Sequence, residues 1–307
     1  MKVKISSIKP QYQYSFSVNN TGIVGVYGIS GSGKSSLLNA IAGYQNDYQG
    51  VITFNGKKLN GIIKCSYMNQ HALLFPHWTV KENLDFAMEH CRNNKTELNQ
   101  LISALDCIEL LDKYPRQLSG GEKQRIAFMR ALIQIEANSI VLLDEPFSAL
   151  DPSLRKIALK LLNEYKHKSL IFLVTHEIAD IYQYADELLY IEDGTIGLHD
   201  EIQGGMSSNH KTLPIASRVK IEDNTHVIYA DSVSINLQKN ELSSISHQLD
   251  ITIEDIQITN NTALLKLNHQ TSNLSQYLYA RLTTSSVERL NLSKTQKAFA
   301  CFKSTIN

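Results

Sequence analysis

The sequence contains no apolar run long enough to cross a membrane. Its most apolar stretches, residues 140–143 and 170–174, fall far short of the roughly 20 residues that a membrane-spanning helix needs. Residues 1–10 carry charges but lack the apolar core of a signal peptide. We therefore expect a protein that is not exported, and that a partner would anchor if it works at a membrane.

Net charge is also lacking, because 30 Lys and Arg residues balance 30 Asp and Glu residues. No overall field would recruit nucleic acid or an anionic bilayer, so any basic patch must be local. The sequence has few cysteines, and they are far apart and form no C-x-x-C pair: Cys65, Cys91, Cys107 and Cys301. This spacing argues against a zinc site or a disulfide framework and predicts reduced, cytosolic thiols. The length of 307 residues allows one large domain and a smaller one.

What the sequence does contain is a glycine-rich stretch at residues 28–35 that fits the pattern G-x-x-x-x-G-K-[ST]. A buried-strand pattern precedes it, and a helical pattern that ends at Gly43 follows it. In that context the glycines let backbone N–H groups surround a polyphosphate, Lys34 reaches the terminal phosphates and Ser35 places its hydroxyl on Mg²⁺. The alternative is a glycine-rich turn that matches by chance. The loop alone leaves GTPases, kinases, helicases and transport ATPases open.

Two positions outside this loop, one aromatic and one polar, are candidates for nucleotide contacts. Residues 2–20 alternate like an edge hairpin, in which Tyr12 is our choice for stacking on adenine, with ordinary strand packing as the alternative. Gln70 follows a predicted strand at residues 65–68, where its amide would coordinate Mg²⁺ or orient water, or lie solvated in a loop. The apolar cluster at residues 73–78 is either core or a socket for a partner helix.

A helical pattern from residue 79 leads to Leu-Ser-Gly-Gly-Glu at residues 118–122 and then to a strong helix former. Ser119 and the glycines that follow would therefore begin a helix, with exposed N–H groups and an outward-facing hydroxyl. That arrangement predicts a second anion site on the same chain.

Two buried-strand patterns end in polar residues. The first ends at Asp144 and Glu145, which strand alternation would point to different sides, one toward the metal shell and the other toward an attacking water. Asp151 follows in a loop, and Pro152 would open the next helix. The second strand ends at His176; a lone His is more often structural, but this position next to other phosphate ligands favours a functional role.

These motifs, in this order, resemble those of the ATP-binding cassette (ABC) transporter ATPases over residues 1 to about 200. The resemblance implies an α/β fold, a P-loop NTPase cassette with a mixed sheet and a helical subdomain at about residues 79–130. It also implies a head-to-tail homodimer that encloses two ATP molecules and Mg²⁺, with each site shared between subunits.

The resemblance assigns roles residue by residue. Glu145 would be the general base and His176 the γ-phosphate sensor, with Gln70 beside them. The metal ligands would be Ser35, Gln70 and Asp144. One subunit would hold the nucleotide with Tyr12, Ser30, Gly31, Ser32, Gly33, Lys34, Ser35 and Ser36. The opposite subunit would close the site with Ser119, Gly120, Gly121 and Asp151.

Composition shifts after residue 204, so we expect an ATP-binding domain at 1–204, a linker at 205–213 and a second domain at 214–307. Short alternating stretches predict that this second domain is a small all-β, OB-like barrel. Such a fold can bind nucleic acid, but the dense basic and aromatic pattern is missing, and we expect no nucleic-acid partner.

The second domain resembles the MOP/TOBE-type molybdate-binding module of molybdate importer ATPases, with one departure. The Arg-Asn pair of that family is replaced by Ser246 and His247, which removes charge-assisted donors for an oxyanion. Ser244, Ser246, Lys303 and Ser304 would remain as donors. Anion binding and a barrel that only dimerises are both left open.

The resemblance implies the ATP-hydrolysing subunit of an importer for a small oxyanion, with molybdate as our choice. It would be a peripheral protein at the cytoplasmic face of the membrane, bound to integral permease subunits and indirectly served by an extracytoplasmic substrate-binding protein. The first alternative is another cargo (sulfate, sugar, polyamine or metal) with a purely dimerising barrel. The second is a nucleic-acid-associated ABC ATPase, which would need a long coiled coil between Gln70 and Ser119, or a second cassette.

Overall fold

The computed structural model divides into two compact units, Met1–His199 and Asp200–Asn307. It describes residues 1–7, 12–45, 47–59, 65–89, 95–202, 215–221, 224–239, 247–259, 262–270 and 275–302. The predicted linker at 205–213 lies outside these residues.

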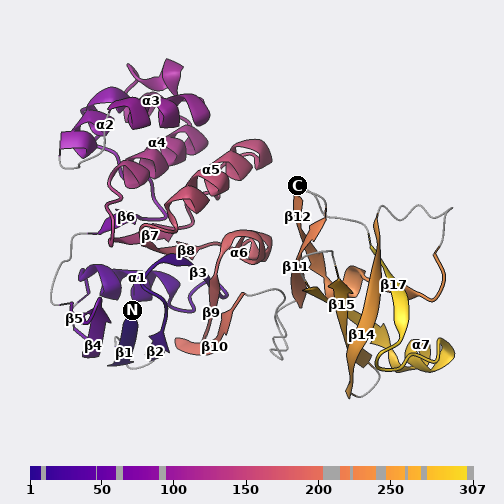
Figure 1. Cartoon of the computed structure of the whole chain (residues 1–307). Helices are drawn as coiled ribbons and strands as arrows, with labels where there is room; N and C mark the ends of the chain where they lie inside the picture. Colours follow the sequence, from indigo (N-terminus) through magenta and orange to yellow (C-terminus); the bar gives the residue numbers. More distant parts are fainter. Residues whose placement is uncertain are drawn as a thin grey trace. The chain divides into compact units, whose positions relative to one another are not determined.

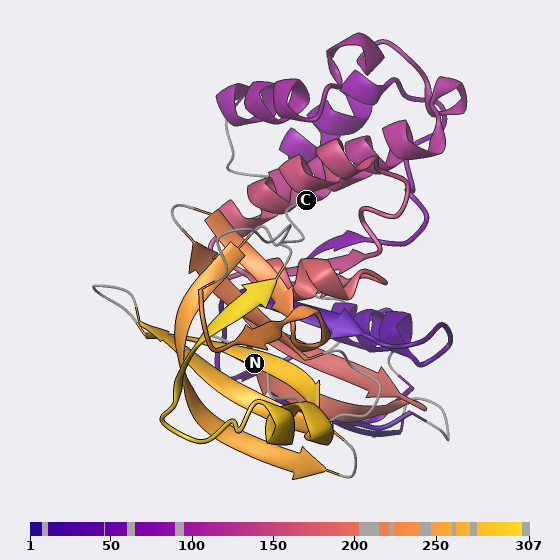
Figure 2. The same cartoon turned by 90° about the vertical axis from the view of Figure 1, so that its right-hand side faces the viewer.

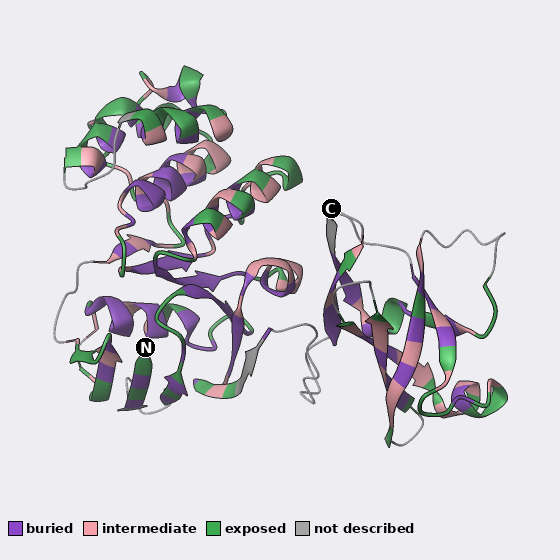
Figure 3. Cartoon of the chain, in the orientation of Figure 1, coloured by how far each residue is buried: buried purple, intermediate pink, exposed green. Residues whose placement is uncertain are grey.

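A six-stranded sheet forms the centre of the first unit, in the order β10-β9-β3-β8-β7-β6 (Figure 1). Its strands are β3 (Gly22–Tyr27), β6 (Ser66–Met68), β7 (Ile140–Asp144), β8 (Leu170–Val174), β9 (Glu187–Glu192) and β10 (Thr195–Glu201). Strand β3 pairs in parallel with β8 and β9, and β7 pairs in parallel with β6 and β8. Every residue of β7 and β8 is buried (Figure 3), which explains why both read as continuous apolar runs.

An antiparallel sheet in the order β2-β1-β4-β5 packs nearby, with α1 (Lys34–Ala42) between it and the larger sheet (Figure 1). Its strands are β1 (Lys2–Ser7), β2 (Tyr14–Ser17), β4 (Gln49–Phe54) and β5 (Lys57–Lys58). A turn at Asn55 and Gly56 joins β4 to β5, with φ values of 49° and 75°. Both residue types tolerate the positive φ that a two-residue hairpin loop requires. Helix α1 ends at Gly43, as predicted, with φ of 80°.

The helices α2 (Val80–Glu89), α3 (Lys95–Ala104) and α4 (Gly120–Ile133) gather at one end of this unit (Figures 1 and 2). They occupy the region predicted to be helical, and α4 continues a few residues further. The short 3₁₀ turns Ile108–Leu110 and Pro115–Gln117 connect α3 to α4, and α5 (Pro152–Tyr165) and α6 (Ile178–Tyr184) follow β7 and β8. Across the described part of the chain, no helix has both the length and the apolar character needed to span a bilayer.

The second unit contains a five-stranded antiparallel sheet in the order β13-β17-β14-β15-β16 and a separate hairpin of β11 and β12. Its strands are β11 (Ala216–Ile221), β12 (Asn224–Tyr229), β13 (Ser234–Asn236), β14 (His247–Thr259), β15 (Thr262–Gln270), β16 (Ser275–Thr283) and β17 (Lys297–Phe302). These strands account for the short alternating stretches of the sequence. Helix α7 (Thr284–Arg289) was not predicted. Its N-cap is Thr283, whose side chain accepts a hydrogen bond from the backbone N of Ser286. The OB-like closure of this unit stays a prediction.

Candidate functional site

The glycine-rich loop between β3 and α1 is held by a tyrosine beneath it. The hydroxyl of Tyr14, which is fully buried in β2, donates a hydrogen bond of 2.9 Å to the carbonyl of Gly33. Gly33 has φ of 108°, and a Cβ atom there would lie 2.3 Å from the Tyr14 hydroxyl oxygen. Only glycine therefore fits at this position.

Helix α1 begins without a side-chain cap, because its N-cap residue is Gly33. Its first-turn N–H groups have no partners within the helix, and they carry the positive end of the helix dipole. A Cβ atom at Gly31 would meet nothing within 4 Å, so the space above the loop is open. An uncapped helix start below an open glycine loop suits a phosphate group.

Lys34 brings its positive charge into the same loop. Its Nζ donates hydrogen bonds to the carbonyls of Gly28 at 2.7 Å and Ile29 at 2.8 Å. Burial lowers the pKa of Lys34, while Glu145 and Asp144 raise it. The ammonium group is thus partly desolvated, which strengthens its attraction for an anion.

A cavity of about 240 Å³ lies above this loop and gathers residues from five places in the chain. The residues that line it are Tyr12, Ser30, Gly31, Gly33, Lys34, Ser35, Ser36, Gln70, Glu145 and His176. All of them are predicted site residues. They meet because β6, β7 and β8 run parallel, so the loops after these strands reach the same edge of the sheet.

The predicted general base is held on both sides. Oε1 of Glu145 lies 2.5 Å from Nε2 of His176, and Oε2 accepts a hydrogen bond of 3.3 Å from Nε2 of Gln70. The expectation that strand alternation separates Asp144 from Glu145 was wrong, because β7 ends at Asp144. Glu145 has φ of 51°, in the left-handed region, so its direction is set by a turn.

Asp144 is 4% exposed and contacts the Ser35 hydroxyl. Burial raises the pKa of Asp144, and the Ser35 hydrogen bond partly opposes this shift. With Gln70, these two residues offer a carboxylate, a hydroxyl and an amide oxygen, which are donors that Mg²⁺ prefers. The donor set therefore fits the metal that the sequence predicts.

Two predicted nucleotide contacts differ in their surroundings. The hydroxyl of Tyr12 donates a hydrogen bond of 3.3 Å to the carbonyl of Gly31, so its ring borders the loop; its stacking on adenine stays a prediction. Ser32 does not line the cavity. Its hydroxyl is buried under the loop and has no hydrogen-bond partner among the described residues.

Ser119, Gly120 and Gly121 begin α4, as predicted, but they do not line the cavity. Ser119 is exposed, and its Oγ also accepts a hydrogen bond of 3.3 Å from the backbone N of Glu122. The Glu122 carboxylate accepts one of 2.6 Å from the backbone N of Ser119, and these bonds lower the pKa of Glu122. The backbone N atoms of Ser119 and Glu122 are therefore paired within the chain by a capping box.

Asp151 also serves a helix in its own chain. It caps α5, and its Oδ1 accepts hydrogen bonds of 3.0 Å from the backbone N atoms of Ser153 and Leu154. Hydrogen bonds from Ser153 and Leu154 lower the pKa of Asp151. Like Ser119, it does not line the cavity.

Three residues that position the site were not singled out from the sequence: Tyr14, Gln124 and Arg155. Arg155 in α5 forms an ion pair of 2.5 Å with Asp180, and its Nη2 lies 3.4 Å from the hydroxyl of Thr175, directly before His176. Gln124 is buried in α4 and binds the loop after Glu145. No signal in the sequence singled out Gln124, which stands in a run of polar residues.

The possible oxyanion residues of the second unit, Ser244, Ser246, Lys303 and Ser304, lie outside the described residues. The neighbouring His247 is described, and its ring stacks on Phe302 at a centroid distance of 5.7 Å. The ring of His226 lies 5.3 Å from that of His247.

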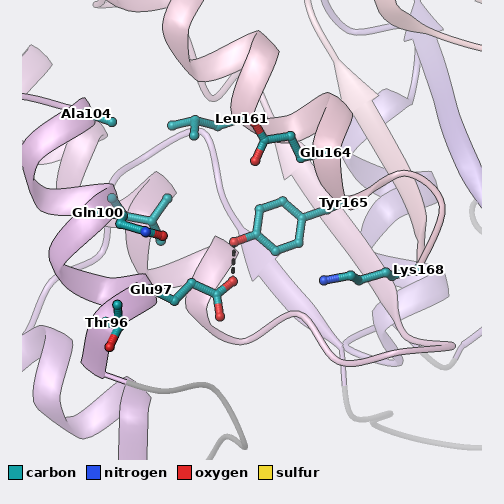
Figure 4. Close-up of a pocket in the computed structure, with 9 residues that line it drawn as sticks. Thr96, Glu97, Gln100, Ala104, Leu161, Glu164, Tyr165 and Lys168 are labelled. Carbon is teal, nitrogen blue, oxygen red and sulfur yellow. Dashed lines mark hydrogen bonds between the residues drawn. The ribbon is translucent and has the colours of Figure 1, made fainter.

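A larger cavity of about 620 Å³ lies between α3 and α5 and contains no predicted site residue. Figure 4 shows Tyr165 of α5 pointing at Glu97 of α3, with a hydrogen bond of 2.7 Å between them. This bond joins the helical end of the unit to α5. Size alone therefore does not identify the site, whereas the convergence of the motifs does.

The chain is similar to known proteins in sequence and in fold. Residues 12–148 match the ABC transporter family. The molybdenum import ATP-binding protein ModC of Haemophilus influenzae is 35% identical over 203 residues, which are 62% of this chain and 57% of that protein. ModC of Salmonella typhimurium is 37% identical over 209 residues, covering 63% of this chain and 58% of that protein. These alignments span little more than half the length of the ModC relatives.

Another relative, with a different name, is matched over more of its own length. The probable sulfate/thiosulfate import ATP-binding protein CysA of Chlorella vulgaris is 34% identical, and the match covers 63% of this chain and 85% of that protein. Among solved structures, the ATP-binding cassette MJ0796, in a dimeric post-hydrolysis state bound to ADP and Pi, has a TM-score of 0.57 at 23% identity. That match covers 66% of this chain and 97% of the other, and it shows the cassette fold. The ordered motifs, the fold and these relatives lead to one conclusion: the chain belongs to the ABC transporter ATP-binding family.

Proposed function

We propose that this chain hydrolyses ATP as the energy-supplying subunit of an ABC importer. The observation that carries the proposal is the Glu145 carboxylate, which contacts both His176 and Gln70. These contacts lie at the edge of the phosphate cradle, the loop and helix start at residues 30–36. A carboxylate fixed in this way can take a proton from a water molecule that attacks the terminal phosphate.

Residues in and beside the cavity divide the parts of this reaction among them. The first-turn N–H groups of α1 and the ammonium of Lys34 bind the phosphates. Ser35, Asp144 and Gln70 would hold Mg²⁺, which when bound neutralises phosphate charge. Glu145 accepts the proton of water, and the imidazole of His176 orients that carboxylate and lies next to the terminal phosphate.

We further propose that the working form is a head-to-tail homodimer. In one chain Ser119, Gly120 and Asp151 are exposed and do not line the cavity, so an opposite subunit would be needed to bring them to ATP. The Ser119 capping box leaves the start of α4 at the surface, where a second phosphate face can form.

A complementation experiment tests the composite site. Lys34→Ala disables the cradle and Ser119→Arg blocks the helix start, so each variant alone should have negligible ATPase activity. In a mixed dimer, the intact cradle of one chain faces the intact Ser119 of the other. Random mixing should restore up to about a quarter of wild-type activity, because half of the dimers are mixed and each has one intact site. No recovery on mixing would contradict the shared site.

The permease would dock at an aromatic cluster that begins a few residues after Gln70 in the sequence. The ring of Phe75 lies 4.5 Å from that of Trp78 and 5.3 Å from that of Phe86, and the guanidinium of Arg130 lies 5.9 Å from the Phe75 ring. An apolar depression of about 300 Å³ adjoins them. Such a half-exposed aromatic surface suits a short helix of a membrane subunit at the cytoplasmic face. Phe75→Asp should keep the ATPase activity of the isolated protein but release it from membranes that contain the permease.

For the cargo we propose a small oxyanion, with molybdate first because two of the cited relatives bear the name ModC. Sulfate is the second candidate, since a relative named CysA is covered over more of its length. The second unit, proposed as an OB-like MOP/TOBE-type regulatory barrel, would sense the anion despite Ser246 and His247. Titration calorimetry of the full chain with molybdate, tungstate and sulfate decides this point. A saturable signal for one anion supports sensing, and no signal for any of them leaves a dimerisation role.

A further inference from the structure

The side-chain amide of Gln124 forms hydrogen bonds with one short loop, residues 145–149. Its Nε2 donates hydrogen bonds to the carbonyl of Glu145 at 3.1 Å and to the hydroxyl of Ser148 at 2.7 Å. Its Oε1 accepts a hydrogen bond of 2.7 Å from the backbone N of Ala149. The residue is 5% exposed, and a buried amide is stable only when its hydrogen bonds are made. The side chain thus fixes the loop at residues 145–149 to α4.

A second contact joins the same two elements. A Cβ atom at Gly121 would lie 2.6 Å from the carbonyl oxygen of Ala149, so the backbones of α4 and this loop touch. Gly121 and Gln124 are three residues apart and therefore share one face of the helix. That face of α4 forms a joint with the loop after β7.

The joint acts on the most strained residue of the cavity. Glu145 has φ of 51°, a left-handed conformation that is strained for a residue other than glycine. Its backbone N donates to the carbonyl of Val174 at 3.0 Å, and its carbonyl accepts from Gln124. The peptide groups before and after Glu145 are thus each held by a hydrogen bond, which fixes the direction of its side chain.

We propose that Gln124 is a positioning residue for Glu145: by holding the Glu145 carbonyl, it aims the carboxylate at His176 and Gln70. The inference rests on the proposed ATPase function and extends it. Gln124 also lies on the helix that begins at Ser119, so one side chain connects the base of one site to the helix start that would close the other. It never contacts the cavity itself.

The variant Gln124→Met tests the role, because methionine has a similar volume but makes none of the three hydrogen bonds. We expect the KM for ATP to stay within about twofold while kcat falls about tenfold or more, as misplacement of a catalytic group predicts. Amide hydrogen exchange at residues 146–150 should rise, and exchange at residues 31–36 should not change. The matched control is Lys123→Met, since the Lys123 side chain forms no hydrogen bond or ion pair within the described residues. Wild-type kcat in Gln124→Met would overturn the inference.

Gln124→Glu separates the donor role from the acceptor role. A carboxylate still accepts from the backbone N of Ala149 but cannot donate to the Glu145 carbonyl. We expect its kcat to fall as far as that of Gln124→Met. A kcat close to wild type would mean that only the Ala149 contact matters, and the proposal would be wrong.

Mixed dimers place the effect in one subunit. In the complementation pair, Gln124→Met is added either to the Ser119→Arg chain, which supplies the working Glu145, or to the Lys34→Ala chain, which supplies the working Ser119. We expect the loss of activity only in the first case. A loss only in the second would show action through Ser119 and overturn the proposal. If the wild-type chain itself does not hydrolyse ATP, the proposed function fails, and the exchange measurement still reports on the joint.

Discussion

Nε2 of His176 lies 2.5 Å from Oε1 of Glu145, although the two residues follow different strands of the sheet. Gln70 donates to the other carboxylate oxygen, and among the described residues that line the cavity Glu145 is the only one with a carboxylate. Within the described residues, this makes Glu145 the group best placed to receive a proton from water.

Replacement of this carboxylate should separate binding from hydrolysis. In Glu145→Gln, kcat should fall by about 10²–10⁴, because an amide cannot accept the proton, while ATP affinity should stay within about threefold. Steady-state ATPase assays and a fluorescent-nucleotide titration measure the two effects. Glu177→Gln is the control, since the Glu177 side chain is 62% exposed and the residue directly follows His176. Near wild-type hydrolysis by Glu145→Gln would remove this residue from the role.

The two glycines at the start of α4 should respond differently to the same substitution. Gly121→Ala places a methyl group 2.6 Å from the Ala149 carbonyl, so α4 must shift, and we expect a loss of about 1–3 kcal/mol in the free energy of unfolding. Gly120→Ala meets nothing within 4 Å and should leave stability unchanged or raise it by up to about 1 kcal/mol. Urea unfolding of the two variants measures the difference. Equal stabilities would contradict the close joint.

Two described cysteines should react slowly in the folded protein. Burial raises the pKa of the Cys65 and Cys107 thiols to about 11, from an ordinary value of 9.0. At pH 8 this lowers the reactive thiolate fraction about 100-fold. A short iodoacetamide pulse followed by peptide mass spectrometry measures the rate at each site. The unfolded protein is the control, and equal rates in the two states would contradict the burial.

The cradle could be predicted from the sequence because its residues are contiguous. Residues 30–36 form one loop and one helix start, so their geometry follows from local glycine and helix chemistry. Gln70, Glu145 and His176 are far apart in the chain, yet each follows a strand of one parallel set. Since such strands end at the same edge of the sheet, a correct strand assignment already brings the three together.

The rest could not be predicted because it depends on tertiary contacts. Gln124 stands in the polar run Glu-Lys-Gln-Arg and looks solvent-exposed, and only packing reveals that its amide is buried. The left-handed backbone of Glu145 leaves no trace in the residue type, so strand alternation gave the wrong reason for its direction. Tyr14 resembled any inward-facing strand aromatic, and its bond to Gly33 appears only when β2 meets the loop.

The ion pair between Arg155 and Asp180 gives a last prediction about stability, pH and turnover. Asp180 is held by Nε and Nη2 of Arg155, and the same guanidinium reaches Thr175, next to His176. Burial raises the pKa of Asp180, and Arg155 partly opposes this shift. A carboxyl group whose pKa is raised on folding binds protons better in the folded state. It therefore reduces stability as the pH rises above its ordinary value of 3.8.

Removal of Arg155 should increase the loss of stability that accompanies a rise in pH. In Arg155→Met the opposing effect is gone, so the pKa of Asp180 rises further and the free energy of unfolding falls more steeply with pH than in the wild type. We expect a deficit of about 1–3 kcal/mol near pH 7 that shrinks near pH 4, because the buried carboxylate has lost its partner. Turnover should drop several-fold as the turn before His176 loosens. The double variant Arg155→Met with Asp180→Leu removes both charges and should regain most of the stability but not the turnover. A deficit that is independent of pH, or a double variant no more stable than the single one, would contradict this account of the ion pair.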